Sequence, residues 1–206
     1  MEKFLEGIEK FRNEDYVSYK DLFEELKDKQ NPHTLFISCS DSRIDPSLIT
    51  KTQPGELFII RNIANIVPPY REAEEYLATT SAIEYAVLFL DVENIIVCGH
   101  SNCGGCAASL KPDILEKLPH TKKWLELCNP VSDRVLRENK NEKLKVIEWL
   151  MEQSNVLEQL KNLLTYPYIK ERVLDGKLTI NGWYYIIKTG EIYIYNKEIY
   201  KFILAN

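Results

Sequence analysis

Three short apolar runs in the first half of the chain constrain its fold more than any other feature. They occupy Thr34–Cys39, Glu56–Arg61 and Asn94–Cys98. Each resembles a strand that is buried on both faces of a sheet. Segments with helical periodicity separate the runs. Because strands that alternate with helices are typical of α/β proteins, the pattern predicts an α/β fold with a mainly parallel central β-sheet flanked by helices.

The rest of the chain adds helices and a strand-rich tail. Helix patterns cover 1–30, 45–50, 72–90, 104–110, 144–164 and 167–176. The tail runs 178–180, 183–187 and 192–195 predict strands around a turn at Thr189-Gly190, with an antiparallel C-terminal hairpin at one edge of the sheet. No repeat or flexible linker divides the chain. We therefore expect residues 1–206 to form a single domain, with 1–30 as an N-terminal helical arm.

Composition and charge argue against several classes of protein. A chain of 206 residues can bury a core without disulfides. Its 26 basic and 31 acidic residues leave a net charge of −5, which argues against a nucleic-acid partner. No apolar run approaches the roughly 18 residues of a membrane span, and the start lacks the pattern of a secretory signal. Five cysteines cannot all pair within one chain, so we expect reduced thiols and a cytoplasmic protein.

Three potential metal ligands stand at the ends of two predicted strands. Cys39 ends the first run, and His100 and Cys103 follow the third. Because ligands collect outside the carboxyl ends of parallel strands, these side chains are expected to converge. Two thiolates and one imidazole with an open fourth position are typical of a catalytic zinc site. Gly104 and Gly105 would leave the metal side uncrowded, and the amides that begin the next helix could face an anion.

Other interpretations of the cysteines and the histidine remain open. A buried cysteine at a strand end is more often a small apolar residue, and a loop histidine is more often hydrogen-bonded than metal-bound. Cys103-x-x-Cys106 could be a redox pair, but a thioredoxin-type site needs a different strand context. Cys98 and Cys128 are expected to be packing thiols.

An acidic and a basic residue stand two positions apart directly after the first cysteine. Arg43 next to Asp41 would keep the carboxylate charged and hold it in a bidentate fork. A carboxylate held in this way can accept a hydrogen bond from a metal-bound hydroxide without ligating the metal. If the pair opens, Asp41 can become a fourth ligand. The alternative is a surface ion pair that contributes less than about 1 kcal/mol.

These motifs, in their order and spacing, resemble those of the β-class carbonic anhydrases. The matching strings are Cys39–Arg43, Gln53–Glu56, Arg61–Asn65, Glu84–Val87 and Gly99–Gly105, with Gly182-Trp183 in the tail. Together they cover roughly residues 28–110 and 178–196, whereas 111–175 matches only as a helical segment. Five ordered motifs are far more specific than one Cys-x-Asp-x-Arg string would be.

The resemblance implies a zinc lyase that hydrates carbon dioxide to bicarbonate and a proton through a zinc-bound hydroxide. One zinc ion per chain would be held by Cys39, His100 and Cys103. The catalytic dyad of the family falls on Asp41 and Arg43, and Asp41 would be a fourth zinc ligand only in the closed, inactive state.

The resemblance also implies a site type and an assembly. Gln30 stands nine residues before the first ligand, as in the plant-like type, and would donate to the substrate across a dimer interface. The other type has a tryptophan where this chain has Phe36. The substrate pocket would be formed by Phe58, Ile63, Tyr85 and the Gly104 amide, although the three side chains could equally be core residues. The partners expected are small-molecule substrate and further copies of the chain, in a homodimer or homotetramer.

Three competing functions follow from the same residues. A related hydrolase would act on carbon disulfide or carbonyl sulfide, which share the linear shape of carbon dioxide. A noncatalytic homologue would bind zinc or bicarbonate only, but it would have no need of the Asp41–Arg43 pair. A zinc nucleobase deaminase needs a His-x-Glu motif, and His100 is followed by Ser101 and Asn102 instead.

Overall fold

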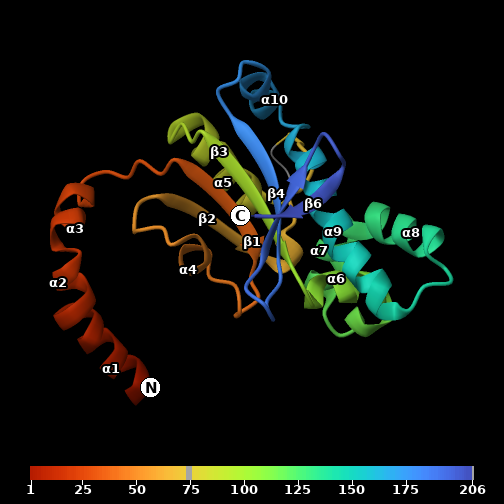
Figure 1. The fold of residues 1–206 in the computed structure, drawn as a ribbon, viewed down its shortest axis with the longest axis horizontal. Coiled ribbons are helices and arrows are strands. Elements are labelled where there is room, and N and C mark those ends of the chain that lie inside the picture. The colour runs from red at the N-terminus through yellow and green to blue at the C-terminus, as the bar shows by residue number, and fades with distance from the viewer. Residues whose placement is uncertain (73–75, 206) are drawn as a thin grey trace. The chain divides into compact units, whose positions relative to one another are not determined.

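The fold divides into two compact units, Met1–Asn31 and Pro32–Asn206. The computed structural model describes residues 1–72 and 76–205, apart from the side chain of Pro112 (Figure 1). No helix in this described part of the chain combines the length and the apolar character that a membrane crossing requires.

The first unit is a series of helical segments without a core of its own. Its segments are α1 (Glu2–Lys10), a π-helical turn (Phe11–Asp15), α2 (Tyr16–Ser18) and α3 (Lys20–Leu26), and none contains a buried residue. Phe4, Leu5 and Ile8 lie on α1 with more than half of each side chain exposed. Most of the surface of these apolar side chains is therefore not covered within their own unit.

A six-stranded sheet forms the centre of the second unit (Figure 1). Its strands are β1 (Thr34–Cys39), β2 (Leu57–Asn62), β3 (Asn94–His100), β4 (Thr179–Tyr185), β5 (Ile192–Asn196) and β6 (Lys201–Leu204). They lie in the order β2-β1-β3-β4-β5-β6, with the first four parallel and the last two antiparallel to their neighbours. The predicted α/β fold with a mainly parallel sheet and antiparallel C-terminal strands is confirmed.

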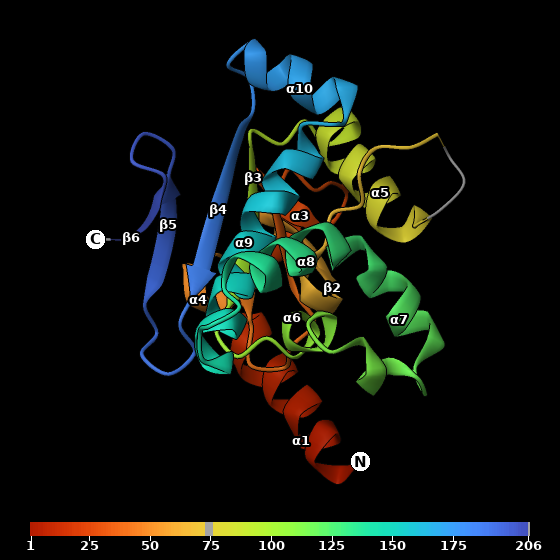
Figure 2. The same ribbon diagram turned by 90° about the vertical axis from the view of Figure 1, so that its right-hand side faces the viewer.

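Helices cover this sheet, and α6 begins at its carboxyl edge, just after β3 ends. They are α4 (Pro46–Thr50), α5 (Leu77–Glu84) with the π-helical turn η3 (Tyr85–Phe89), α6 (Gly104–Ser109), α7 (Pro119–Leu125), α8 (Asn129–Glu138), α9 (Leu144–Leu163) and α10 (Pro167–Leu174). Single turns of 3-10 helix occupy η2 (Ile63–Asn65), η4 (Pro112–Leu115) and η5 (Glu126–Cys128). Figure 2 shows α8 and α9 in front of the central strands.

Side chains along β1 point alternately to the two faces of the sheet and pack in two different cores. Leu35 and Ile37 pack in the main core with residues of α5, α9 and α10. Phe36 faces the other way and meets Trp183 edge-on, with ring centroids 5.8 Å apart. Since strand side chains alternate between faces, Cys39 points to the side of Leu35 and Ile37, toward α6 and α9.

Within the described residues, the structure departs from the sequence prediction in the tail and at the start of one helix. The tail contains an additional edge strand, β6, and the two runs expected at 178–187 form the single strand β4. The helix expected over 72–90 begins only at Leu77, because Tyr76 adopts a left-handed backbone (φ 58°) and packs its ring against Trp124. Residues 73–75 of that expected helix lie outside the described residues.

Candidate metal centre

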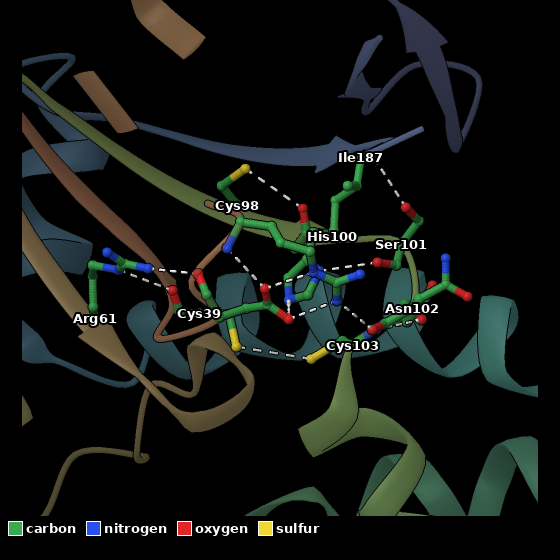
Figure 3. Close-up of polar contacts among 12 residues, drawn as sticks. Cys39, Arg61, Cys98, His100, Ser101, Asn102, Cys103 and Ile187 are labelled. Carbon is green, nitrogen blue, oxygen red and sulfur yellow. Dashed lines mark hydrogen bonds and ion pairs between the residues drawn. The ribbon is translucent and has the colours of Figure 1, made fainter. Parts of the chain in front are cut away.

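The three predicted ligands meet where the order of the strands reverses. The chain passes from β1 to β2 on one side and then to β3 on the other, so β1 and β3 flank a topological switch point. Cys39 is the last residue of β1, His100 is the last residue of β3, and Cys103 precedes α6. Their ligand atoms lie within 4.8 Å of one another, and the two sulfur atoms are 3.9 Å apart (Figure 3).

The histidine is oriented as a metal ligand requires. Its Nδ1 lies 3.0 Å from the carbonyl oxygen of Ser101, an acceptor that places the ring hydrogen on Nδ1. Nε2 then presents a lone pair, and it is buried with no hydrogen-bond partner. A buried polar atom without a partner is costly, and a cation held between this nitrogen and the two thiols would remove that cost.

Ionisation of the two thiols is unfavourable unless a cation is bound. The pKa of Cys39 is raised to about 12, first by its contact with Cys103 and then by burial. The pKa of Cys103 is also raised, chiefly by its contact with Cys106. A bound divalent cation would reverse this effect, because it stabilises coordinated thiolates and so lowers the pKa of the thiols. The Cys₂His donor set therefore fits a zinc ion.

The acidic and basic pair forms the predicted fork beside this centre. Arg43 donates from Nε to Oδ1 of Asp41 at 2.9 Å and from Nη2 to Oδ2 at 2.7 Å. This fork holds the pKa of Asp41 well below its usual range. Oδ2 lies 4.0 Å from Nε2 of His100, so the carboxylate borders the centre while both of its oxygens contact arginine. Arg61 donates to the carbonyl oxygens of Cys39 and Asp41 and thereby fixes the turn (Figure 3).

A largely apolar cavity of about 450 Å³ opens onto the centre. Cys39, one of the three ligands, lines it together with Asp41, Ile63 and Gly104. Most of the remaining wall comes from apolar residues between α6 and the end of α7, namely Ala108, Ile114, Leu115, Leu118 and Leu125. Sequence reasoning missed this wall. The available signal was the row of leucine and isoleucine residues in 110–125, which lacks a clean helical period.

The other expected pocket residues lie elsewhere in the single chain. Phe58 and Tyr85 contact each other, with ring centroids 5.9 Å apart, and do not line this cavity. Tyr85 also stacks on Phe89. Gln30 belongs to the first unit, Met1–Asn31.

The two glycines after Cys103 serve different purposes. An added Cβ at Gly104 would meet nothing within 4 Å, in agreement with the expected open space. At Gly105 it would lie 2.9 Å from side-chain atoms of both Ile63 and Ala64. Gly105 is therefore crowded rather than open, and its lack of a side chain lets α6 pack against the 63–64 turn.

The five cysteines are all free and buried. Cys98 lies on β3 in the small core around Phe36, and its Sγ contacts the carbonyl oxygen of Gly99 at 3.5 Å. Cys128 contacts Oδ1 of Asn155 at 3.7 Å. Both surroundings are consistent with packing thiols.

Comparison with known proteins gives consistent matches along the chain. A family model described as carbonic anhydrase matches residues 34–192. A carbonic anhydrase from Helicobacter pylori (strain J99) is 45% identical over 206 residues, covering 98% of this chain and 93% of that protein. The solved β-carbonic anhydrase CcaA is 41% identical, with a TM-score of 0.95 over 100% of this chain and 99% of that one. A structure from a study of two tetrameric β-carbonic anhydrases of Sordaria macrospora is 32% identical, with a TM-score of 0.83 over 94% and 95%.

Proposed function

The chain belongs to the β-class carbonic anhydrase family, and we propose that it hydrates carbon dioxide reversibly to bicarbonate and a proton with one zinc ion per chain. Cys39, His100 and Cys103 would hold the zinc. The observation that carries this proposal is the unpaired, buried Nε2 of His100, which faces two buried thiols at the carboxyl edge of the sheet. Bound zinc would supply Lewis acidity that lowers the pKa of a ligated water toward about 7.

The residues around the zinc ligands would orient and protect the reaction. Asp41, kept ionised by Arg43, would accept a hydrogen bond and aim the attacking oxygen at the substrate carbon. The apolar cavity suits an uncharged linear substrate, and the Gly104 amide borders it. If Arg43 releases Asp41, the carboxylate becomes free to serve as the fourth ligand of a closed state. The five free cysteines support a reducing compartment such as the cytoplasm.

Further copies of the chain would complete the substrate pocket. Phe58 lies on β2, which is an edge strand, and Tyr85 is 41% exposed. The apolar side chains of α1 are also exposed, and relatives from Sordaria macrospora are tetrameric. We therefore assign a homodimer or homotetramer in which Gln30, Phe58 and Tyr85 contribute to a neighbouring copy's pocket. This would be the arrangement of the plant-like type.

Replacing Gln30 by alanine tests that assembly. We expect hydration to slow about tenfold, as one hydrogen bond to the substrate is lost, with no change in zinc content. Sedimentation of the active wild type should show a dimer or a larger species. The neighbouring Lys29→Ala is the control and should leave the rate unchanged. A fully active monomer would contradict the role of Gln30 across an interface.

Zinc content and hydration rate, measured on the same preparation between pH 6 and 9, test the proposed function. We expect one zinc per chain by elemental analysis and stopped-flow hydration far above the buffer background. The same preparation is then offered carbon disulfide and carbonyl sulfide. Turnover of these substrates without carbon dioxide hydration would favour the related hydrolase. Zinc without any turnover would favour a noncatalytic binding protein.

A further inference from the structure

Helix α9 carries a stripe of polar side chains on its buried face. The stripe consists of Glu152, Asn155, Gln159 and Asn162, which are spaced three or four residues apart and are all buried. A helix face against a core is normally apolar, and a buried polar side chain needs a hydrogen-bond partner. The stripe bonds to backbone groups of Ala64, Val67 and Cys103 and to the Tyr184 hydroxyl, and its amides also bond to one another.

Two of the amides hold the segment 64–67, which directly follows the cavity residue Ile63. Asn155 donates from Nδ2 to the carbonyl oxygen of Ala64 at 2.8 Å, and Oε1 of Gln159 accepts from the amide of Val67 at 2.8 Å. Ala64 has a left-handed backbone (φ 63°), and Ile63 immediately before it lines the cavity. These contacts support an otherwise unfavourable backbone conformation.

Glu152 makes the corresponding contact with a ligand segment. Its Oε1 accepts from the backbone amide of Cys103 at 2.9 Å, and its Oε2 accepts from the hydroxyl of Tyr184 at 2.5 Å. Asn102, just before the ligand, has a left-handed backbone (φ 56°). The carboxylate therefore joins α9 and β4 to the one ligand that lies beyond the end of a strand.

Two glycines allow α9 to approach the sheet closely enough for this contact. An added Cβ at Gly99 would lie 2.5 Å from Cγ2 of Val156, and one at Gly182 would lie 2.9 Å from Cγ1 of the same side chain. Val156 stands one helical turn beyond Glu152. A larger residue at either strand position would push α9 outward and carry the carboxylate away from Cys103.

We propose that Glu152 is a positioning residue for the metal centre. Its carboxylate accepts from the Cys103 amide on one oxygen and from the Tyr184 hydroxyl on the other, and it thereby keeps the Cys103 thiol in place for zinc. The inference rests on the proposed zinc site and concerns a residue that would not touch the metal. Hydrogen-bond partners of this outer kind tune metal affinity because they restrict the positions open to a ligand.

Zinc release from the full chain tests the proposal. Zinc-loaded protein is mixed with excess chromogenic chelator, and the release rate is compared among Glu152→Leu, Glu152→Gln, Tyr184→Phe and wild type. We expect Glu152→Leu to release zinc about 10- to 100-fold faster. Glu152→Gln retains an oxygen for the Cys103 amide and should therefore change the rate less than Glu152→Leu does. Tyr184→Phe, which removes only the hydroxyl, should lie between Glu152→Leu and wild type. In cobalt-substituted Glu152→Leu, the thiolate-to-cobalt absorption band should shift.

Tyr166→Phe is the matched control for Tyr184→Phe. Both tyrosines are 1% exposed, but the Tyr166 hydroxyl donates to the carbonyl oxygen of Pro68, away from the ligands. Its zinc release should match wild type. Equal release from all variants, or equal acceleration in both tyrosine variants, would overturn the role of Glu152. A wild type without zinc would instead contradict the proposed function, so the two failures are distinguishable. If Glu152→Leu does not fold, Tyr184→Phe and Tyr166→Phe decide the question.

Discussion

Cys103→Ser should empty the zinc site and reduce carbon dioxide hydration to the uncatalysed rate. A serine hydroxyl does not ionise near neutral pH and is a poor zinc donor, whereas a thiolate is among the strongest. The two remaining ligands, Cys39 and His100, would leave the ion with too few protein donors for tight binding. Elemental analysis and stopped-flow hydration on the same purified protein measure both effects.

Cys98→Ser is the control for the loss of a buried thiol. Cys98 is as buried as Cys103, at 1% exposed, but it lies in the small core on the other face of the sheet. This variant should retain one zinc per chain and normal hydration, even if its stability falls. Full zinc content in Cys103→Ser would show that Cys103 is not a ligand.

The strand framework could be predicted because its signals are local. Each buried strand is a contiguous run, and the rule that parallel strands present their carboxyl ends at one edge connects Cys39 to His100 across about sixty residues of sequence. Cys103 follows His100 on the same short segment. Strand β6 was missed because its four residues carry too short a pattern to recognise.

The wall of the cavity and the stripe on α9 could not be predicted, for a different physical reason. In the sequence, Glu152, Asn155 and Gln159 are typical of the solvent face of an amphipathic helix. They can be buried because they hydrogen-bond to backbone groups that are far away in the sequence. Asn155, for example, donates to the carbonyl oxygen of Ala64, 91 positions away. No local periodicity encodes such a pairing. Likewise, Phe58 and Tyr85 contact each other rather than the cavity, so their proposed role depends on a second copy of the chain.

Asp41→Asn should retain zinc and slow hydration by about 10²- to 10³-fold, the usual effect of removing one positioned hydrogen-bonding group from an active site. Asparagine has nearly the shape of aspartate. Because Asp41 is not one of the three grouped ligands, its replacement should leave the metal in place. Asparagine lacks the negative charge, however. Its NH₂ group would also stand where an oxygen of Asp41 accepts from Nη2 of Arg43 at 2.7 Å, so two donors would face each other. The fork would open, and the charged hydrogen-bond acceptor beside the centre would be lost.

Asp45→Asn is the matched control, because it makes the same chemical change four residues away. Oδ1 of Asp45 caps α4 by accepting from the amide of Leu48 at 3.1 Å, and asparagine caps helices equally well. The pH profile separates the two aspartates further. Because the pKa of Asp41 lies below its usual range, its carboxylate is charged throughout pH 6 to 9 and would protonate only in stronger acid. The deficit of Asp41→Asn should therefore be of similar size across that range. Near-normal hydration in Asp41→Asn, or a deficit confined to the acidic end, would contradict the role assigned to this carboxylate.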